Sequence, residues 1–363
     1  MPKNRNLYQS NALFVGPSPA SGQFFSSGNS GANLVLQLHR VQTNSFDFNV
    51  AREDVFQFSQ LAALSKEIIE PPTVNYNFSY LVTNVYNEVA LGMSLAPSGL
   101  ISRFLTKEAD EKNYFTITAP EGFDAANYVG SSGEFQTVGV SNGSINSYAV
   151  EAAVGGLPTA TVGVEGLNFV IYQGVSGVGP AINRSNGARI ASNNFLIPPT
   201  QSGLAGQVPT LRPGDVELSL GLVGVGVDLI QAHIQSVNFS VDLSRESLQR
   251  LGSRFAFAKE ITVPINATMS VNANVSDLTT GSLSDVFCND QSYNLTVNLR
   301  KPSCSGAGPV AYSITMRNAK LDSQSFSQDV GNTAGMSVDL TFTASVGGAG
   351  DQVNGLFLSG LLV

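Results

Sequence analysis

Charged residues are scarce in this sequence. Lys, Arg, Asp and Glu together make up 13% of its 363 residues, about half the share in an average globular domain. Because charge keeps protein surfaces apart, so sparse a surface favours a protein that associates with other chains. The formal net charge of −8 argues against a protein that binds nucleic acid by neutralising phosphates with Lys and Arg. An acidic protein can still surround nucleic acid when its role is to let it pass.

The residue types that usually carry catalysis or metal binding are also few. Tryptophan is absent, and His39 and His233 stand outside any HExxH or HxH pattern, so we interpret both histidines as core or rim residues of strands. The sequence contains no GxSxG, P-loop or CxxC pair, and no GxGxxG after a strand. We therefore predict no enzyme, no catalytic or metal-binding residue and no cofactor. A glycosidase with two carboxylates stays open, although the lack of tryptophan platforms weighs against it.

Cysteine and long apolar runs are sparse as well. The two cysteines, Cys288 and Cys304, could form a disulfide or remain thiols, so the redox compartment stays open. The longest apolar runs, such as residues 356–363, fall short of the roughly 18 to 20 residues that a transmembrane helix needs. The N-terminal segment has no apolar stretch typical of a signal peptide. We expect neither membrane insertion nor secretion of this chain.

Gly, Ser, Asn, Thr and Val take the place of the missing charges. This composition is typical of an all-β protein with many turns. Apolar and polar residues alternate with period two over residues 34–41, 46–50, 73–82 and 266–275, and residues 113–119 and 293–299 are further strand segments. We therefore expect a mainly β fold.

The chain contains an internal duplication. Residues 41–82 align without a gap on residues 234–275, a shift of 193, and ten positions are identical, where unrelated segments would share roughly two to four. The identical pairs are Gln42/Gln235, Phe46/Phe239, Arg52/Arg245, Glu53/Glu246, Ala63/Ala256, Lys66/Lys259, Glu67/Glu260, Ile68/Ile261, Pro71/Pro264 and Val82/Val275. Other pairs keep their apolar character, among them Phe58/Leu251 and Leu64/Phe257.

A second block repeats further along the chain. Residues 142–164 align on residues 318–340, now with a shift of 176, and Asn142/Asn318, Ser147/Ser323 and Val162/Val338 are among the identical pairs. The change from 193 to 176 makes the second copy 17 residues shorter between the blocks. Two copies at this long period indicate a duplicated domain and not a solenoid of short repeats.

These patterns predict the domain organisation. We expect two tandem β-sandwich or barrel domains at residues 34–175 and 213–346, joined by a Gly/Pro-rich linker at 176–212. Residues 1–33 are expected to form an extended arm, and residues 347–363 a tail that is either a last strand or a contact with another subunit. Val55, Phe58, Leu61 and Leu64 are spaced as on a helix, so each domain is expected to contain a short helix there, ended by proline.

The charged pairs inside the first block are the ionic features kept in both copies. We interpret them as ion pairs at domain or subunit seams, with unremarkable surface charge as the alternative. A catalytic site would ordinarily occur once, whereas these residues occur twice. The predicted seam residues are Arg52, Glu53, Lys66, Glu67, Arg245, Glu246, Lys259 and Glu260.

The two repeated blocks together resemble the tail tube, or major tail, proteins of tailed bacteriophages. The resemblance is carried by the strand–Arg-Glu–short helix–Pro-Pro–strand pattern of residues 46–82 and by the segment from Asn142 to Gly155, repeated from Asn318 to Gly331. It covers most of residues 34–346 and implies small β-sandwich or barrel domains with one helix and a long hairpin. Most members of that family have one domain per chain, so two in tandem imply a trimer with pseudo-sixfold symmetry.

The resemblance also implies a function and partners. The expected role is a structural virion protein whose homotrimeric rings stack into a tube, assembled in the host cytoplasm, with double-stranded DNA passing through the lumen unbound. Other tail proteins, such as the terminator, baseplate, sheath or tape measure, are the expected partners. The alternatives are a baseplate, tail-tip or collar ring of the same module and, from another class, a secreted β-sandwich adhesin.

Overall fold

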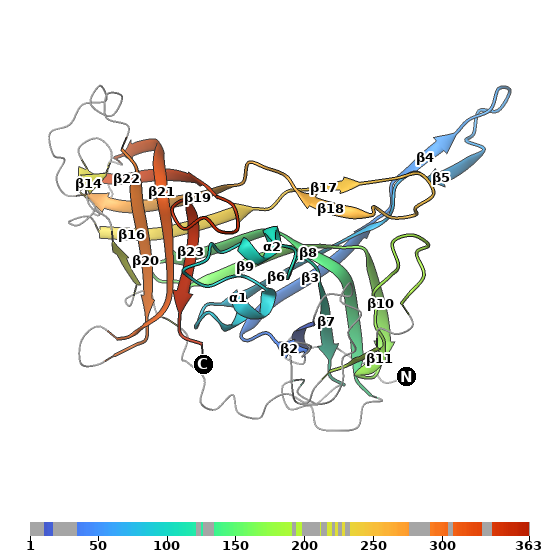
Figure 1. Ribbon diagram of the computed structural model, residues 1–363, viewed down its shortest axis with the longest axis horizontal. Helices are drawn as coiled ribbons and strands as arrows, with labels where there is room; N and C mark the ends of the chain where they lie inside the picture. The colour runs from blue at the N-terminus through green and yellow to red at the C-terminus, as the bar shows by residue number, and fades with distance from the viewer. Residues whose placement is uncertain are drawn as a thin grey trace.

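The fold is mainly β, as the sequence predicts. The computed structural model describes residues 11–16, 35–120, 125, 134–190, 194–197, 211, 216–219, 222–223, 227–228, 233–275, 291–303, 308–328 and 336–362. Antiparallel strands dominate this part of the chain, and the two short helices lie near the middle of the molecule (Figure 1). The cysteines fall outside the described residues, so their pairing stays open.

The strands fall into two groups, which we call the first and the second module. The first module consists of β1 (Asn11–Gly16), β2 (Leu36–Gln37), β3 (Val41–Asn49), β4 (Arg52–Val55), β5 (Ser65–Ile68), β6 (Thr73–Leu81), α1 (Tyr86–Leu91), α2 (Ser102–Leu105), β7 (Lys112–Thr118), β8 (Gln136–Ala153), β9 (Thr159–Gly166) and β10 (Asn168–Gln173). The second module consists of β13 (Val216–Ser219), β14 (Leu222–Val223), β15 (Val227–Asp228), β16 (His233–Asp242), β17 (Arg245–Leu248), β18 (Ala258–Ile261), β19 (Asn266–Val275), β20 (Tyr293–Arg300), β21 (Val310–Ser327), β22 (Met336–Ser345) and β23 (Gly355–Gly360).

The two modules repeat one strand pairing in one register. Phe46 of β3 lies opposite Tyr76 of β6, and Phe239 of β16 lies opposite Met269 of β19, each shifted by 193. The long strands β8 and β21 correspond with a shift of 176, since Asn142 and Asn318 both adopt a positive φ, 49° and 54°. Both duplicated blocks therefore have the same backbone conformation, down to a left-handed residue that asparagine tolerates better than most side chains.

The structure corrects the second alignment by two residues after the turn. Val74 of β6 lies opposite Gly166 of β9, whereas the equivalent Ala267 of β19 lies opposite Ala344 of β22. Residue 166 therefore corresponds to residue 344, a shift of 178, and the pairing of Val162 with Val338 was wrong. The connection from β21 to β22 is two residues longer than that from β8 to β9, and sequence identity alone did not locate this insertion.

The predicted arm and tail each contain a strand of the fold. β1, within the predicted arm at 1–33, pairs with β7 as β13 pairs with β20. β23, within the predicted tail at 347–363, pairs with β21 as β10 pairs with β8, at equivalent positions. The prediction of an arm outside the domain is thus wrong for residues 11–16, and the tail adopts the last-strand alternative. The burial of Leu13, Phe14 and Leu358 supplies the reason, because these side chains complete the core.

The predicted helix after β3 is a β-hairpin in both modules. β4 pairs with β5, which together we call the first hairpin, and β17 pairs with β18 as the second hairpin. Ser59 and the equivalent Gly252 adopt positive φ values of 74° and 83° in the tips, a conformation that no helix contains. The helix-like spacing was misleading because its apolar residues face solvent at the tips, and no core selects that periodicity. The two helices lie instead in the first module, between β6 and β7, and the described part of the second module has none.

One sheet runs through both modules. Its order is β3-β6-β9-β8-β16-β19-β22-β21. The two modules are therefore joined where β8 of the first module pairs with β16 of the second. The N-terminal parts of β8 and β21 leave this sheet to pair with β7 and β10 and with β20 and β23. Each long strand therefore links two layers of its module, and a single hydrophobic core joins residues of both modules.

The predicted linker packs on the first module. Its described part contains β11 (Ser176–Val178) paired with β12 (Asn194–Leu196). Phe195 is buried and stacks on Phe115 of β7 with ring centroids 4.8 Å apart. The described part of this Gly/Pro-rich stretch thus packs against the first module.

Candidate assembly surfaces

The two modules meet along β8 and β16, which we call the internal junction. The pairing places Phe239 opposite Val150 and Val241 opposite Tyr148. These side chains are all buried. Backbone hydrogen bonds extend the pairing at both ends, from Val154 N–H to Gln235 O and from Leu243 N–H to Asn146 O. The modules are therefore joined by a continuous sheet and a shared core.

A buried carboxyl group lies beside this junction. Tyr80 and Tyr148 both donate hydrogen bonds to Oε1 of Glu88 in α1, at 2.8 and 2.9 Å. The hydroxyl of Tyr148 also lies 2.9 Å from that of Tyr312, which belongs to β21 of the second module. Because Tyr148 donates to Glu88, it accepts from Tyr312. The network thus extends from α1 across the junction into the second module.

Burial sets the charge state of Glu88. The side chain is completely buried, and desolvation raises its pKa to about 7, against the opposing effect of the hydrogen bonds from the two tyrosines. Its Oε2 has no hydrogen-bond partner among the described residues. Burial therefore makes this carboxyl group hold its proton to a higher pH than an exposed glutamate does.

The segment that is longer in the first module covers the second. Ala96 N–H donates to Leu358 O at 2.7 Å, and Leu100 N–H donates to Leu356 O at 2.8 Å. Both acceptors lie on β23, whose leucine side chains are buried. Most of the difference in length that the alignment located between the blocks therefore falls in α1, α2 and the loop around them, which contact the second module.

The second hairpin lies across the first module and forms ion pairs with it (Figure 1). Arg245 lies 2.5 Å from Asp110 (Nη1 to Oδ1), with its side chain almost fully buried. Lys259, also buried, lies 2.5 Å from Glu165. Arg245 and Lys259 are thus each paired with a carboxylate of the first module. Without these carboxylates, burial would make the charged forms of both side chains unfavourable. Desolvation lowers the pKa of Lys259, while Glu165 opposes this shift.

Further polar contacts join the second hairpin to the first module and to the predicted linker. Glu260 pairs with Lys107 on the surface at 2.5 Å. Arg184, from the predicted linker, pairs with Glu111 and donates to Ala256 O at 2.8 Å. Phe255 N–H in turn donates to Arg184 O at 3.2 Å. The second hairpin is therefore fixed along its length by residues outside its own module.

The equivalent residues of the first hairpin lie in a different setting. Arg52, Glu53 and Glu67 are exposed, and among the described residues they form no ion pair with the second module. Among the described residues, Lys66 forms its ion pair within the hairpin, with Asp54 at 3.1 Å. Figure 1 shows this hairpin projecting beyond the rest of the molecule. Of the eight predicted seam residues, the structure thus brings Arg245, Lys259 and Glu260 to the other module, while Glu246 and the four residues of the first hairpin lie away from it.

An apolar face of the first module is exposed where the second module buries the equivalent face. Phe46 and Phe48 of β3 are 41% and 60% exposed, whereas their equivalents Phe239 and Val241 are 3% and 2% exposed. On β10, Ile171 is 62% exposed, whereas its equivalent, Leu358, is fully buried. The second module's copy of this face is covered by the first module, so the first module's copy lacks its cover.

At the opposite end of the long sheet, it is the second module that has the exposed apolar residue and the first module that buries the equivalent one. Phe326 near the end of β21 is 44% exposed, whereas the equivalent Val150 of β8 is 4% exposed because it packs at the internal junction. Sequence analysis missed these edge residues as a site. The identity of Phe46 with Phe239 was the available signal, but it could not tell which copy is covered.

The hairpin tips form a third kind of surface. Phe58 and its equivalent Leu251 are both almost fully exposed. Leu64 and its equivalent Phe257 are both about half exposed. Both copies therefore keep apolar residues on these hairpins and bury them in neither module, so contacts among the described residues do not explain them.

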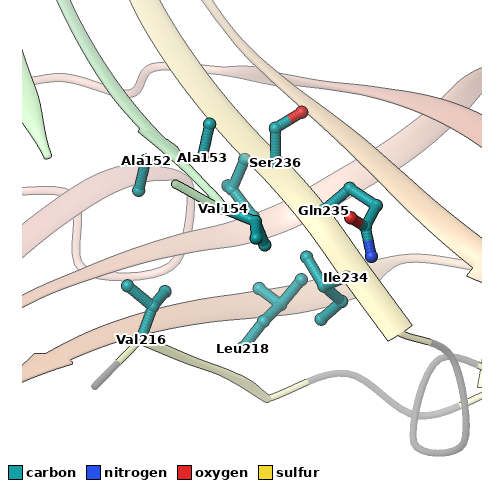
Figure 2. Close-up of a pocket in the computed structure, with 9 residues that line it drawn as sticks. Ala152, Ala153, Val154, Val216, Leu218, Ile234, Gln235 and Ser236 are labelled. Carbon is teal, nitrogen blue, oxygen red and sulfur yellow. The ribbon is translucent and has the colours of Figure 1, made fainter. Parts of the chain in front are cut away.

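Two cavities of different size are lined by described residues. One cavity of about 60 Å³ lies where β8 ends and β16 begins, beside β13, and Figure 2 shows mainly apolar side chains around it, including Val154, Leu218 and Ile234. It is far below the roughly 300 Å³ of a small-molecule pocket. A larger open groove of about 480 Å³ separates the base of the first hairpin from the tip of the second. Within the described parts of the chain, no cluster of three His, Cys, Asp or Glu could hold a metal ion.

The histidines occupy structural positions. His39 stacks on Tyr86 with ring centroids 4.4 Å apart, and burial lowers its pKa. Its backbone exchanges hydrogen bonds with the side chain of Asn87. His233 is an exposed residue at the start of β16. Neither histidine lies in a group that could bind a metal among the described residues.

Comparison with known proteins adds little. No protein-family model and no curated protein matches the chain. One similar solved structure is the cryo-EM structure of the anti-feeding prophage (AFP) baseplate, 6-fold symmetrised, with 11% sequence identity and a TM-score of 0.25 over 41% of this chain and 93% of that chain. A likeness of this size does not bear on function. No helix in the described residues is long and apolar enough to cross a membrane.

Proposed function

We propose that this chain is a structural virion protein that forms a phage tail tube from stacked trimeric, pseudo-hexameric rings. The observation that carries the proposal is the mismatch in burial between the modules. The face formed by Phe46, Phe48 and Ile171 is exposed, while its equivalent in the second module is covered by the first module. A second copy of the chain supplies the missing cover by the same contact.

Repetition of this contact produces a closed assembly. The internal junction joins the end of one module to the start of the next, which is a head-to-tail contact. Such a contact closes into a ring when its rotation fits the symmetry, and it then leaves no free sheet edge. Six modules in a ring require three copies of this two-module chain, as the resemblance to tail tube proteins implies.

The hairpin tips favour a tube over a single ring. Phe58 and Leu251 are exposed in equivalent positions of both modules, so a closed ring would present them at each of its modules. A second ring stacked on the first buries such a repeated apolar contact. The partners are then further copies of the chain and, at the ends of the tube, other tail proteins.

The chemistry of the chain suits the passage of DNA. Its net charge is negative and its charged residues are few, so a lumen built from it would bind a polyanion weakly. Double-stranded DNA is therefore proposed to move through the tube without specific binding during ejection.

Electron microscopy of the purified chain in negative stain, with mass photometry of the same sample, tests the proposal. Long hollow tubes above a trimeric species are the expected result. Isolated closed rings would instead support a baseplate, tail-tip or collar protein. A monomer at every concentration would overturn the assembly and return the secreted adhesin to consideration.

A further inference from the structure

We infer that β21 of one copy pairs antiparallel with β3 of the next copy, with Phe326 opposite Phe46 and Ser327 opposite Ser45. This inference rests on the proposed self-assembly and specifies the partner strands and their register. Its template is the internal junction, which is the same contact made between two modules of one chain.

The register follows from the two shifts that relate the modules. At the internal junction Phe239 lies opposite Val150, and Asn238 lies opposite Glu151. The shift of 193 converts Phe239 and Asn238 into Phe46 and Ser45, and the shift of 176 converts Val150 and Glu151 into Phe326 and Ser327. Both shifts are supported by the backbone, since the strand irregularities at Val41/Thr43 and Ile145/Ser147 recur at Ile234/Ser236 and Leu321/Ser323.

Both strands are available for this pairing. In the described residues, β3 pairs with β6 alone, and the C-terminal part of β21 pairs with β22 alone. Each is therefore an edge of the described sheet, with no second strand of the described residues beside it, and such an edge draws a further strand. The two edges lie at opposite ends of the same sheet.

The side-chain faces agree with the inferred register. Phe46 lies opposite the buried Tyr76 of β6, and Phe326 lies opposite the buried Val338 of β22, so both phenylalanines lie on the core face of the sheet. Pairing with a slip of one residue would place one of them on the outer face. The inferred register brings together two partly exposed aromatic side chains, which stabilise cross-strand pairs.

The neighbouring positions raise no conflict of charge. Asp47 is placed opposite Ser325, and Asn49 opposite Ser323, so no like charges face each other. Phe46 and Phe48 already pack against Phe169 of β10, with ring centroids 5.8 and 5.6 Å apart. Phe326 of the next copy would extend this aromatic cluster.

Disulfide trapping tests the register with isosteric substitutions. The chain has serines at 323, 325 and 327 of β21, all on one face of the strand. In the inferred register Ser327 lies opposite Ser45 of β3, and Ser325 and Ser323 lie two and four residues further along β21. Ser45→Cys is combined with Ser327→Cys, Ser325→Cys or Ser323→Cys in a background in which Cys288 and Cys304 are replaced by serine. Assembled samples are oxidised mildly and resolved on non-reducing gels.

The Ser45→Cys/Ser327→Cys chain is expected to give covalent oligomers in several-fold higher yield than the Ser325 and Ser323 controls. Directly opposed residues of an antiparallel pair lie about 4.5 to 5.5 Å apart, a spacing that a disulfide spans. Within one chain the two positions lie at opposite ends of the long sheet, so every such disulfide joins two copies. A ladder that stops at the trimer would match the proposed ring.

The other results have separate meanings. A highest yield from the Ser325→Cys or Ser323→Cys combination, or covalent dimers from Ser45→Cys alone, would overturn the inferred register or strand pair while tubes still form. No cross-link in assembled tubes would place the contact elsewhere on the chain. Absence of assembly in the unsubstituted chain, seen by microscopy, would instead count against the proposed function itself.

Discussion

The two hairpins have almost the same charged residues and opposite surroundings. In the second hairpin, Arg245 and Lys259 are buried against carboxylates of the first module. In the first hairpin, the equivalent Arg52 and Lys66 are exposed, and the ion pair of Lys66 within the described residues is with Asp54 of the same hairpin. The residues are the same, so the difference lies in what each hairpin contacts.

This comparison separates folding from assembly. Some residues contact the other module, whereas the equivalent residues of the other copy do not. The fold of a single module does not explain why such residues are kept in both copies. Their presence in both copies is explained when modules contact each other in a series and the chain contains only one of those contacts. The sheet edges show the same relation, with Phe239 buried and Phe46 exposed. In the proposed assembly, another copy of the chain would cover the exposed face of the first module, as the first module covers the equivalent face of the second within the chain.

The largest expected contrast is between Phe239→Ala and Phe46→Ala. Phe239→Ala leaves a cavity in the core of the internal junction and should lower the free energy of unfolding by about 3 to 5 kcal/mol. Phe46→Ala removes a partly exposed side chain and should lower it by less than about 1.5 kcal/mol, yet abolish or strongly weaken assembly. Urea unfolding of the unassembled chain and mass photometry measure the two effects. Equal losses of stability would contradict the comparison.

The next contrast is between Arg245→Ala and Arg52→Ala. Removal of Arg245 leaves Asp110 largely buried without its cation, which should cost about 3 kcal/mol of stability. Arg52 is exposed, so its removal should change the stability of the unassembled chain by at most about 0.5 kcal/mol. The same urea experiment measures both. If Arg52→Ala also leaves assembly unchanged, its interpretation as a seam residue is wrong.

Glu88→Gln tests the internal junction through pH. Because burial raises the pKa of Glu88 from 4.5 to about 7, the folded chain binds a proton that the unfolded chain has lost in this window, and stability falls as pH rises from about 4.5 to 7. The pKa difference corresponds to a loss on the order of 3 kcal/mol. Glutamine keeps the oxygen that accepts from Tyr80 and Tyr148 without ionising.

The pH experiment compares urea unfolding of the two chains at several pH values. The Glu88→Gln chain should lack the fall in the free energy of unfolding between about pH 4.5 and 7, and above pH 7 it should be more stable than the unsubstituted chain. Glu217→Gln serves as a control, because that carboxylate is half exposed and pairs with Arg300 away from α1. Parallel curves for Glu88→Gln and the unsubstituted chain would rule out ionisation of Glu88 as the cause.

The smallest expected effect on folding comes from the hairpin tips. Phe58→Ser and Leu251→Ser replace almost fully exposed side chains, so each should change the free energy of unfolding by at most about 0.5 kcal/mol. If the tips join stacked rings, the double variant should shorten tubes to single rings in negative stain while the trimer persists in mass photometry. Tubes of unchanged length would remove the tips from the stacking contact.

Much of the fold was predictable because its signals are local. The alternating strands β6 and β19 and the equivalent β7 and β20 follow from apolar periodicity. The hairpins were missed because their apolar residues serve no core within the chain, so helical spacing had no physical meaning there. β1 was missed because Pro and Gly surround a short strand whose burial depends on β7, more than ninety residues away in the sequence.

The candidate surfaces were predictable only in part. The repeated Arg-Glu and Lys-Glu pairs identified the hairpins as positions of interest, and the identity of Phe46 with Phe239 identified an important strand. The partners Asp110 and Glu165 were not predictable, because they lie in parts of the first module that the alignment does not relate to the hairpin. The Glu88 network was not predictable either, since it lies in the segment that differs most between the copies.

The sequence by itself determined that the chain is β-rich, duplicated and poor in charge, because composition, alternation and repetition are properties of residue order. Only the tertiary structure decided which copy of each repeated residue is covered. Phe46 and Phe239 are the same amino acid in the same strand position, and their burial differs because β16 pairs with both β19 and β8, whereas β3 pairs with β6 alone among the described strands. Burial depends on neighbours brought together by folding, and a chain with two modules contains one junction between them.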